Sequence, residues 1–307
     1  MNLGRLRMLD EVARHGTLAG AADALSFTPA AVSQSMSRLE AEVGAVLLVR
    51  SSRGVQLTEA GQVLLGHARR ILAEVHAAEA ELGALDDLGA GTLRLGSFPT
   101  ATQTLTARAL AIFRERHPRI VVRLVDDEPH NNLVRLDEGQ LDLALVFAVD
   151  DRPLGVDYYG RAVCRAEAVA VEELFQDHYV VVVPADDALS DRPVRIDDLR
   201  DQPLIGRPAT PGMGVLAAAC RARGFEPRFN DYYCPDYQGV RALVAAGEGL
   251  AIVPTMAVVR PLPGVATRRL EDLPLRRRVL LARAAGGPQT PAAVEMSRVL
   301  RAMAATL

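Results

Sequence analysis

Small polar side chains gather in one segment near the start of the chain, TPAAVSQSMSRLEAEVG, which covers residues 28–44. Its central part contains Ser33, Gln34, Ser37 and Arg38. Hydroxyl, amide and guanidinium groups form hydrogen bonds, but this set includes no side chain that would act as a general base at neutral pH. The segment therefore indicates recognition of a polar partner through hydrogen bonds.

The apolar residues of the same segment show how its polar side chains are positioned. They are spaced by four, three and four residues, and they are Val32, Met36, Leu39 and Val43. This spacing predicts a helix over residues 29–43 with an apolar stripe that faces a core, so the polar side chains lie off the stripe. Thr28 and Pro29 are typical of a helix start, and Gly44 is typical of a helix end.

Two further helices are predicted before this one, over residues 3–15 and 18–25. Two short helices, a tight turn and a third helix with a polar face are typical of a helix-turn-helix, which places a helix in the major groove of DNA. The sequence after residue 44 predicts a two-stranded wing with two Arg residues at its tip. Double-stranded DNA is therefore the predicted partner. The candidate contacts are Thr28, Pro29, Ser33, Gln34, Ser37, Arg38, Arg50 and Arg53.

The net charge of the chain gives the DNA-binding hypothesis little support. The chain has 35 basic residues, all of them Arg, against 38 acidic residues, and its net charge is -3. Residues 1–60 contain six Arg and six acidic residues, so this part is neutral. Arg38 could also pair with Glu42, four residues further along the helix. We therefore expect modest non-specific affinity for DNA and a dependence on specific contacts and on several DNA-binding heads.

A longer helix is predicted from residue 59 to about residue 88, and Thr58 could cap it. Its apolar residues recur at alternating intervals of four and three, and they are Leu64, Ala68, Ile71, Val75, Ala78, Leu82 and Leu85. Heptads of this regularity are typical of a seam between two helices, so this segment predicts a dimer. Gly89-Ala90-Gly91 follows as a hinge.

From residue 92 onwards, short β-rich runs alternate with helical patterns. This alternation predicts βαβ units, mostly parallel sheets and two α/β lobes with a ligand cleft between them. A helix over residues 291–304 should cover the first lobe. The predicted domains are residues 1–58 (winged helix-turn-helix), 59–90 (linker helix and hinge) and 91–307 (ligand-binding domain). Within the last, lobe I covers approximately 91–163 and 268–307, and lobe II approximately 164–267.

Two predicted helix starts indicate an anion site in that cleft. In LRLGSFPTATQTL, residues 97–101 lie at the carboxyl end of a strand and the start of a helix, where α/β sheets bind ligands. We predict that Ser97, Thr100 and Thr210 hold a small carboxylate or similar anion, although each hydroxyl could instead only cap its helix. The further candidates are Phe98, Glu128, Phe147 and Tyr237.

No catalytic or metal-binding pattern is present in the sequence. The six His residues are scattered, and Cys164, Cys220 and Cys234 lack the spacing of a zinc site. The sequence therefore predicts no cofactor and no enzyme, and a thiol switch between Cys220 and Cys234 stays open. A signal peptide and a long apolar run are also absent, so a cytoplasmic protein without a membrane partner is expected.

Many of these residues recur in one known family. They are Leu6 to Gly16, Ala21-Ala22, Leu25, Ala31-Val32-Ser33, Leu39-Glu40, Gly44, Leu47, Arg50, Arg53, Leu57-Thr58 and Ala60-Gly61. Together they resemble the LysR-type transcriptional regulators, with mild departures at Thr17, Met36, Val43 and Leu48. Residues 139–145 (GQLDLAL) and 243–254 (LVAAGEGLAIVP) resemble signatures of that family's effector domain.

The resemblance implies the architecture and the partners of the chain. It implies an α/β fold with an all-α winged helix-turn-helix, a dimerising linker helix and a two-lobed effector domain like that of periplasmic binding proteins. The implied function is sequence-specific DNA binding controlled by a small-molecule effector. The implied assembly is a dimer or a tetramer built as a dimer of dimers, with RNA polymerase as a further partner.

Two other classes of protein were weighed against this interpretation. A periplasmic solute-binding module shares the two-lobed fold, but the missing signal peptide and the N-terminal helices argue against it. An enzyme that uses the cleft is the other alternative, and the lack of any acid–base or nucleophile set argues against it.

Overall fold

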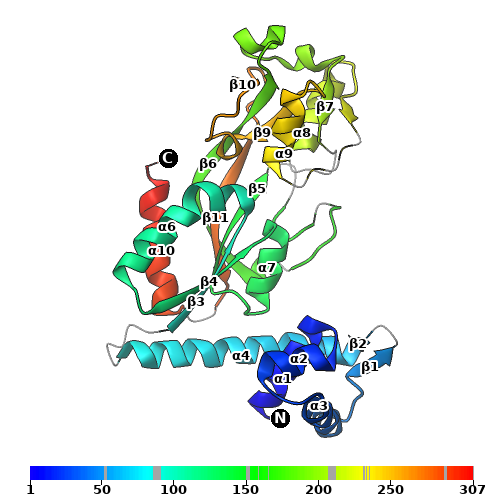
Figure 1. Cartoon of the computed structure of the whole chain (residues 1–307), viewed down its shortest axis with the longest axis vertical. Coiled ribbons are helices and arrows are strands. Elements are labelled where there is room, and N and C mark those ends of the chain that lie inside the picture. Colours follow the sequence, from blue (N-terminus) through cyan, green and yellow to red (C-terminus); the bar gives the residue numbers. More distant parts are fainter. Residues whose placement is uncertain are drawn as a thin grey trace. The chain divides into compact units, whose positions relative to one another are not determined.

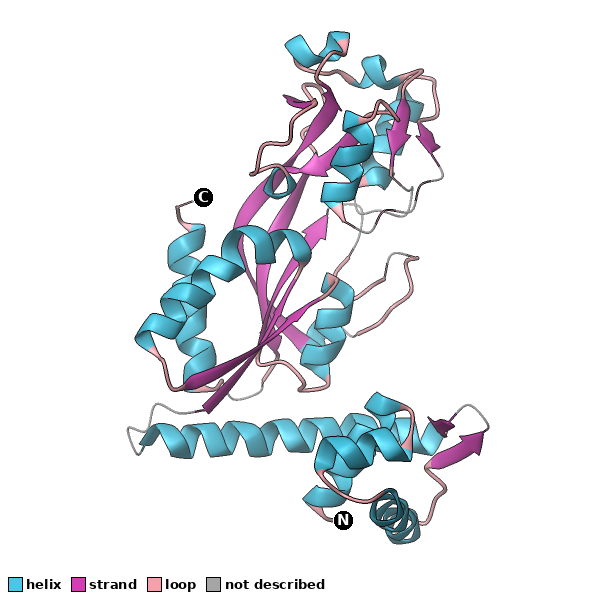
Figure 2. Cartoon of the chain, viewed as in Figure 1, coloured by secondary structure: helices cyan, strands magenta, loops and turns pink. Residues whose placement is uncertain are grey.

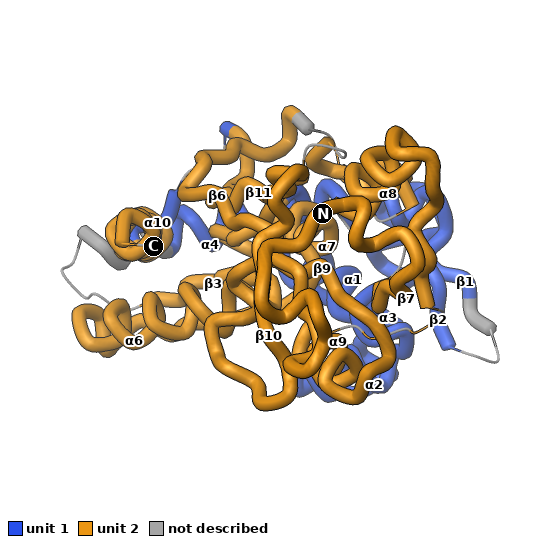
Figure 3. Tube along the Cα trace, turned by 90° about the horizontal axis from the view of Figure 1, so that it is seen from above, with its two compact units in different colours: residues 1–90, 137–140, 286–291 blue, residues 91–136, 141–285, 292–307 orange. Residues whose placement is uncertain are grey.

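The computed structural model is shown in Figures 1 and 2. It describes residues 1–51, 54–85, 91–149, 153–157, 159–164, 166–206, 212–230, 232, 234, 236–286 and 289–306. The chain divides into two compact units (Figure 3). The first comprises residues 1–90, 137–140 and 286–291, and the second comprises the remainder. The domain limits at residues 58 and 90 stay a prediction.

The first unit begins with three helices at the predicted places: α1 (Leu3–His15), α2 (Leu18–Leu25) and α3 (Pro29–Val43). The hydroxyl of Thr17 accepts the Gly20 N–H at the start of α2. Gly16 ends α1 with φ of 65°, a left-handed conformation that glycine adopts without steric cost. The helices enclose a core that includes Leu9, Val12, Val32, Met36 and Leu39, so the predicted stripe of α3 is buried as expected.

The predicted wing follows, formed by β1 (Leu48–Ser51) and β2 (Gly54–Leu57), which pair antiparallel. Glu40 near the end of α3 ties the wing to the helix, because its Oε1 accepts the N–H groups of Leu47 at 2.8 Å and Leu48 at 3.2 Å. The next helix, α4 (Glu59–Leu85), begins where predicted, and the Thr58 hydroxyl accepts the Gly61 N–H at 3.0 Å.

The predicted seam on α4 has two parts. Leu64 and Ala68 pack into the core of the first unit, so they are not free for a second helix. Further along the helix, Ile71 is 39% exposed and Leu82 is 65% exposed. An uncovered apolar stripe therefore begins at Ile71, one heptad later than the sequence pattern begins.

The second unit is built on a seven-stranded sheet of mixed direction. Its strands are β3 (Gly91–Ser97), β4 (Ile120–Asp126), β5 (Leu143–Val149), β6 (Val169–Pro184), β9 (Ala251–Pro254), β10 (Val265–Arg269) and β11 (Arg276–Ala284). Their order is β10-β6-β11-β5-β3-β4, and β9 also pairs with β6. Only β3 makes parallel pairs, with β4 and β5.

The prediction of mostly parallel sheets is therefore wrong for this sheet. Strand β6 pairs antiparallel with β9, β10 and β11, and β11 pairs antiparallel with β5. Strands β10 and β11 follow each other along β6, because β10 pairs with residues 180–184 and β11 pairs with residues 169–178. Neither strand was predicted, and β6 begins inside the stretch 148–173 that was expected to be irregular.

Helices flank this sheet. The first run comprises α5 (Pro99–Ala101), a π-helical turn (Thr102–Thr106) and α6 (Ala107–Arg116), so its first helical residue, Pro99, lies within the predicted segment 97–101. The others are α7 (Pro129–Asp137), α8 (Met213–Ala222), α9 (Tyr237–Ala245) and α10 (Pro291–Ala304). Strands β7 (Pro203–Ile205) and β8 (Arg228–Asn230) form a small parallel sheet. No helix in the described ranges has the length and apolar character needed to cross a membrane.

Strand β5 shows how the sheet of the first lobe separates two apolar layers. Leu143 and Leu145 pack in one cluster with residues of α6 and α10, whereas Ala144 and Val146 pack in another with residues of α7. Alternate residues of a strand point to opposite faces, which explains this division. Figure 1 shows α6 and α10 beside each other on one side of the sheet and α7 on the other. The expected cover of the first lobe by α10 is confirmed.

A separate core defines the second lobe. Val181 and Val183 at the end of β6 pack there with Leu204 and Leu216, whereas Phe175, earlier in β6, packs against the core of the first lobe. The long strand β6 therefore passes from one lobe to the other.

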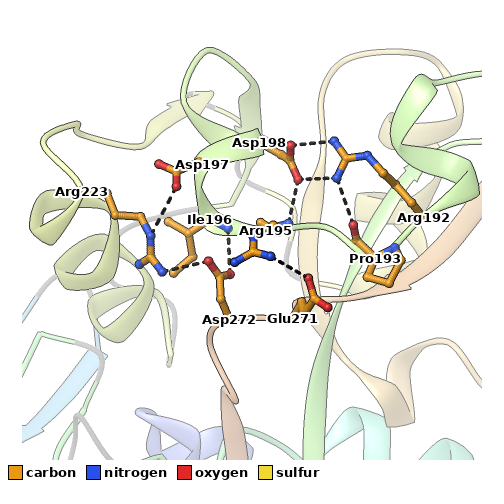
Figure 4. A network of polar contacts seen from close by, with 9 residues as sticks. All are labelled: Arg192, Pro193, Arg195, Ile196, Asp197, Asp198, Arg223, Glu271 and Asp272. Carbon is orange, nitrogen blue, oxygen red and sulfur yellow. Dashed lines mark hydrogen bonds and ion pairs between the residues drawn. The ribbon is translucent and has the colours of Figure 1, made fainter.

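Ion pairs brace the surface of the second lobe (Figure 4). Both Asp198 oxygens accept from Arg192, at 2.7 and 2.8 Å, and one also accepts the Arg195 N–H. Asp272 accepts the Ile196 N–H and a guanidinium N–H of Arg223. The hydrogen bond from Arg192 lowers the pKa of Asp198, although burial opposes this shift.

We expect Asp198→Asn to lower the free energy of unfolding of the second unit by about 1 kcal/mol at pH 7, because it removes a bidentate ion pair. The lowered pKa of Asp198 means that its contribution is complete above the unfolded-state value near 3.9 and is lost as the pH falls through the folded-state value. All six Tyr lie between residues 158 and 237, and Trp is absent, so tyrosine fluorescence in urea reports on this unit. A difference between wild type and variant that is the same at pH 7 and pH 3 would contradict the assignment.

Candidate functional sites

The exposed face of α3 carries most of the predicted DNA contacts. Gln34, Ser37 and Arg38 are exposed, and Ser33 is half-buried. Because the opposite face is fixed in the core and Glu40 fastens the end of the helix to the wing, this polar face has a defined direction. The arrangement suits hydrogen bonding to a large external partner.

Arg38 is not neutralised by Glu42. Glu42 accepts a hydrogen bond from Arg5 and lies 3.6 Å from the terminal amine of Met1, and the bond from Arg5 lowers the pKa of Glu42. Within the described part of the chain, Arg38 makes no ion pair. The alternative pairing of Arg38 with Glu42 is therefore wrong, and the guanidinium of Arg38 keeps its charge available.

The remaining predicted contacts surround the start of α3 and the wing. Thr28 and Pro29 are exposed, and the Thr28 hydroxyl accepts the Ala31 N–H at 3.2 Å. This oxygen caps the helix, yet its own O–H can still donate. Arg50 lies in β1 opposite Val55. Arg53 lies outside the described residues, as does the side chain of Arg50.

The second candidate site lies where β3 ends and α5 begins. Ser97 is fully buried, and its hydroxyl lies 2.7 Å from that of Thr106. The Ser97 hydroxyl therefore has an internal partner, and its contact with an anion stays a prediction. Thr210 lies outside the described residues.

Two aromatic rings and a guanidinium group form the centre of this site. The rings of Phe98 and Phe147 meet edge to face, with centroids 5.1 Å apart. The guanidinium carbon of Arg277 lies 5.1 Å from the Phe98 ring and 4.6 Å from the Phe147 ring. Cations at these distances are attracted to the faces of aromatic rings. The sequence-predicted aromatic residues are thus brought together by an Arg that was not predicted.

Asp177 holds Arg277 in place. The two residues are opposite each other on β6 and β11, and both side chains are 1% exposed. The Oδ2 atom of Asp177 lies 2.9 Å from Nε and 2.8 Å from Nη2 of Arg277. Its Oδ1 atom accepts from the Thr255 hydroxyl and from the Met256 N–H. Both oxygens of this buried carboxylate are therefore bonded.

The guanidinium group also reaches the first lobe. Nη2 of Arg277 donates to the Thr100 hydroxyl at 2.6 Å. Thr100 is 3% exposed and follows directly on the Phe98-Pro99 start of the helical run. One buried cation thus connects the end of β3, the two long strands and the turn after β9.

Tyr237 and Glu128 are the remaining residues that the sequence predicted for this site. Burial raises the pKa of Tyr237, and the charges of Arg277, Glu128 and Asp177 also act on it. Tyr237 begins α9, where Asp236 accepts the N–H groups of Gln238 and Gly239. Of the residues predicted from the sequence, Phe98, Thr100 and Phe147 contact Arg277.

Sequence analysis missed the two charged residues at the centre. Arg277 stands within RRRVLLARA, where it shares one strand face with Val279 and Leu281, both buried. Alternate residues of a strand point to the same face, so recognition of β11 as a strand would have placed the Arg277 side chain on its buried face. The neighbouring Arg276 and Arg278 hide this signal.

Neither a metal-binding group nor a reactive cysteine is supported among the described residues. No group of three or more His, Cys, Asp and Glu side chains there could hold a metal ion. Cys220 is buried, and burial raises the pKa of its thiol, which disfavours the reactive thiolate. The thiol-switch alternative stays untested.

Two family models match the chain. The model described as "Bacterial regulatory helix-turn-helix protein, lysR family" matches residues 3–62, and "LysR substrate binding domain" matches residues 86–305. The SDS degradation transcriptional activation protein of Pseudomonas sp. (strain ATCC 19151) is 32% identical, over 98% of this chain and 94% of that protein. A probable hydrogen peroxide-inducible genes activator of Streptomyces viridosporus is 31% identical, over 98% and 93%.

Solved structures share the fold over the whole chain. Full-length OxyR from Pseudomonas aeruginosa has a TM-score of 0.74 at 22% identity and covers 98% of this chain and 95% of its own. CbnR, a LysR family transcriptional regulator, has a TM-score of 0.67 at 22% identity and covers 99% of each chain. The predicted fold class is thereby confirmed.

The buried pair makes a prediction for stability. Asp177→Asn leaves the Arg277 charge uncompensated, so we expect a loss of about 3–5 kcal/mol in the free energy of unfolding of the second unit. The double change Asp177→Leu with Arg277→Met should cost less than the sum of the two single changes, because it removes both charges. Urea unfolding followed by tyrosine fluorescence measures the wild type, Asp177→Asn, the two single changes and the double change. Additive single effects would show that the two side chains do not act as a pair.

Proposed function

Because the chain belongs to the LysR family of bacterial transcriptional regulators, it is a DNA-binding regulator with an effector-binding domain, and we propose which of its residues perform each task. The observation that carries the proposal is the exposed polar face of α3 on a winged helix-turn-helix. In this proposal α3 enters the major groove of an operator, and the wing contacts the flanking backbone.

The side chains on α3 and the wing have different tasks. Gln34 reads a base edge, because its amide can form two hydrogen bonds with one adenine. Ser33, Ser37, Arg38 and the O–H of Thr28 bond phosphates or neighbouring bases, and Pro29 fixes the start of the helix. Arg50 and Arg53 hold phosphates or enter the minor groove, so they supply affinity without regard to sequence.

Two copies act together in this proposal. The apolar stripe of α4 from Ile71 to Leu82 is exposed in the single chain and has the spacing of a two-helix seam. Pairing through it gives two DNA-reading heads, which suits an operator with two half-sites. A dimer of such dimers, as the family resemblance implies, would add further avidity.

The effector is a small anion bound between the lobes of the second unit. Support comes from the grouping of Thr100, Phe98 and Phe147 around the buried Arg277. The anion must bind one arrangement of the lobes better than another, because equal affinity would shift no population. Enzymatic turnover is not part of the proposal, since both oxygens of Asp177 are already bonded.

Gln34→Ala should weaken discrimination between operator and random duplex by about tenfold or more, because one bidentate base contact accounts for about 1–3 kcal/mol. Arg50→Ala should weaken binding to both duplexes and lower the slope of log K against log salt by about one. Fluorescence anisotropy with DNA from upstream of the chain's own gene measures both effects. Arg298→Ala, which removes an exposed charge from α10, is the matched control. Equal losses on both duplexes for Gln34→Ala would refute its role in reading bases.

Leu82→Glu should shift the dimer towards monomers, with a dissociation constant at least about tenfold higher, because it places a charge in an apolar seam. Sedimentation velocity over a range of concentrations measures this constant. Val63→Glu is the control, since Val63 is 61% exposed on the same helix but lies off the stripe. If Leu82→Glu dimerises as well as the wild type, α4 does not form the seam.

A further inference from the structure

An aromatic ring lies on the surface of the first unit, beside the start of α3. Phe27 is the only Phe, Tyr or Trp among residues 1–90, and it is 52% exposed. It precedes the Thr28 cap by one residue, in the turn that joins α2 to α3 (Figure 1). Large apolar side chains are usually buried. The only aromatic residue of this segment is therefore placed in an exposed turn, outside the core.

The backbone of this turn is held in one conformation. Ser26 has φ of 57° and ψ of 40°, and within the described ranges it is the one residue other than glycine with a positive φ. The N–H of Phe27 donates to the carbonyl of Ala22 at 2.9 Å, and the Thr28 hydroxyl accepts from α3. Hydrogen bonds on both sides therefore fix the backbone from which the ring projects.

Local packing accounts for only part of the ring. An apolar residue at this position commonly contacts the end of the preceding helix or the first turns of the following one, here Ala22 and Val32. Both of these residues are fully buried in the core of the unit. Contacts of this kind can cover one side of the Phe27 ring, but about half of the residue stays exposed after them. That half is available to an external partner.

The position of the turn indicates which partner would cover the ring. In a helix-turn-helix, the residues at the start of the second helix contact base edges in the major groove. Residues 26–30 (SFTPA) are all exposed and carry no charge, so they cannot neutralise phosphates as Arg does. The apolar group that base pairs present in the major groove is the C5-methyl of thymine, and Phe is one of the side chains that contact it.

We propose that Phe27 contacts the C5-methyl group of a thymine in the operator and is thereby a specificity-determining residue. This inference rests on the proposed function of α3 and adds an apolar contact to the polar candidates. The methyl group distinguishes thymine from cytosine, so the contact selects a base and not only a backbone position. An apolar contact releases no counterions, so its contribution to affinity does not depend on salt.

Fluorescence anisotropy tests the contact with two duplexes. One is the operator DNA from upstream of the chain's own gene, and the other is the same DNA with uracil in place of every thymine, which removes only the methyl groups. The wild type should bind the uracil duplex at least about threefold more weakly, as expected when one methyl group leaves an apolar contact. For Phe27→Ala, this ratio between the duplexes should be smaller by about the same factor.

Two comparisons make the result specific. Val63→Ala is the matched control, because Val63 is 61% exposed in the same unit but lies on α4, and it should keep the wild-type ratio. Phe27→Ala should also keep the wild-type slope of log K against log salt, unlike Arg50→Ala. The proposal is overturned by a wild type that binds both duplexes equally, by an unchanged ratio in Phe27→Ala, or by a changed salt slope in that variant.

Photocrosslinking of the wild type covers the case in which Phe27→Ala does not fold. Operator DNA with 5-iodouracil carries iodine where the thymine methyl group lies, and irradiation joins C5 to an aromatic ring in contact with it. Trypsin should place the crosslink in the peptide of residues 15–38, and mass spectrometry should locate it on Phe27. Crosslinks that form only at other residues would contradict the assignment.

Binding of the unmodified operator separates this proposal from the proposed function. If the wild type does not distinguish the operator from random duplex, the assignment of α3 fails, and Phe27 fails with it. If the wild type binds the operator selectively but Phe27→Ala leaves the uracil ratio unchanged, only the role of Phe27 fails.

Discussion

The second unit depends on one buried ion pair, between Arg277 and Asp177. Both side chains are 1% exposed, and an isolated charge at such a depth would cost several kcal/mol. The cost is offset only while β6 and β11 keep the register that sets these residues opposite each other. A slip by one residue would turn the charges towards apolar neighbours, so the pair specifies the alignment of the two long strands.

The same ion pair also makes hydrogen bonds to residues that flank it on both sides, Thr100 and Thr255. Thr100 begins the helical run of the first lobe, whereas Thr255 follows β9, which pairs with the part of β6 that enters the second lobe. One guanidinium and one carboxylate connect them. These bonds therefore tie the start of the helical run in the first lobe to the turn after β9.

The sequence predicted the first unit better than the second for a physical reason. Local signals such as Thr28, Pro29 and Gly44 mark the ends of α3, and its apolar period needs no distant partner. Strands β10 and β11 gain their stability from β5 and β6, far away in sequence, and charged residues obscure their alternation. Phe98 and Thr100 were predicted because they follow a strand, whereas Arg277 and Asp177 required a strand pairing that no local pattern encodes.

The balance of charge in the first unit explains why assembly matters for DNA binding. Six Arg face six acidic residues in residues 1–60, and Arg5 and Arg14 are already paired with Glu42 and Glu11. Few cations therefore remain for phosphates, and counterion release by one head would be small. Arg38 keeps its charge because Glu42 has another partner. A head of this kind gains useful affinity mainly when a second head is linked to it, since the second contact is then made at high effective concentration. The exposed stripe of α4 supplies the surface for such a link.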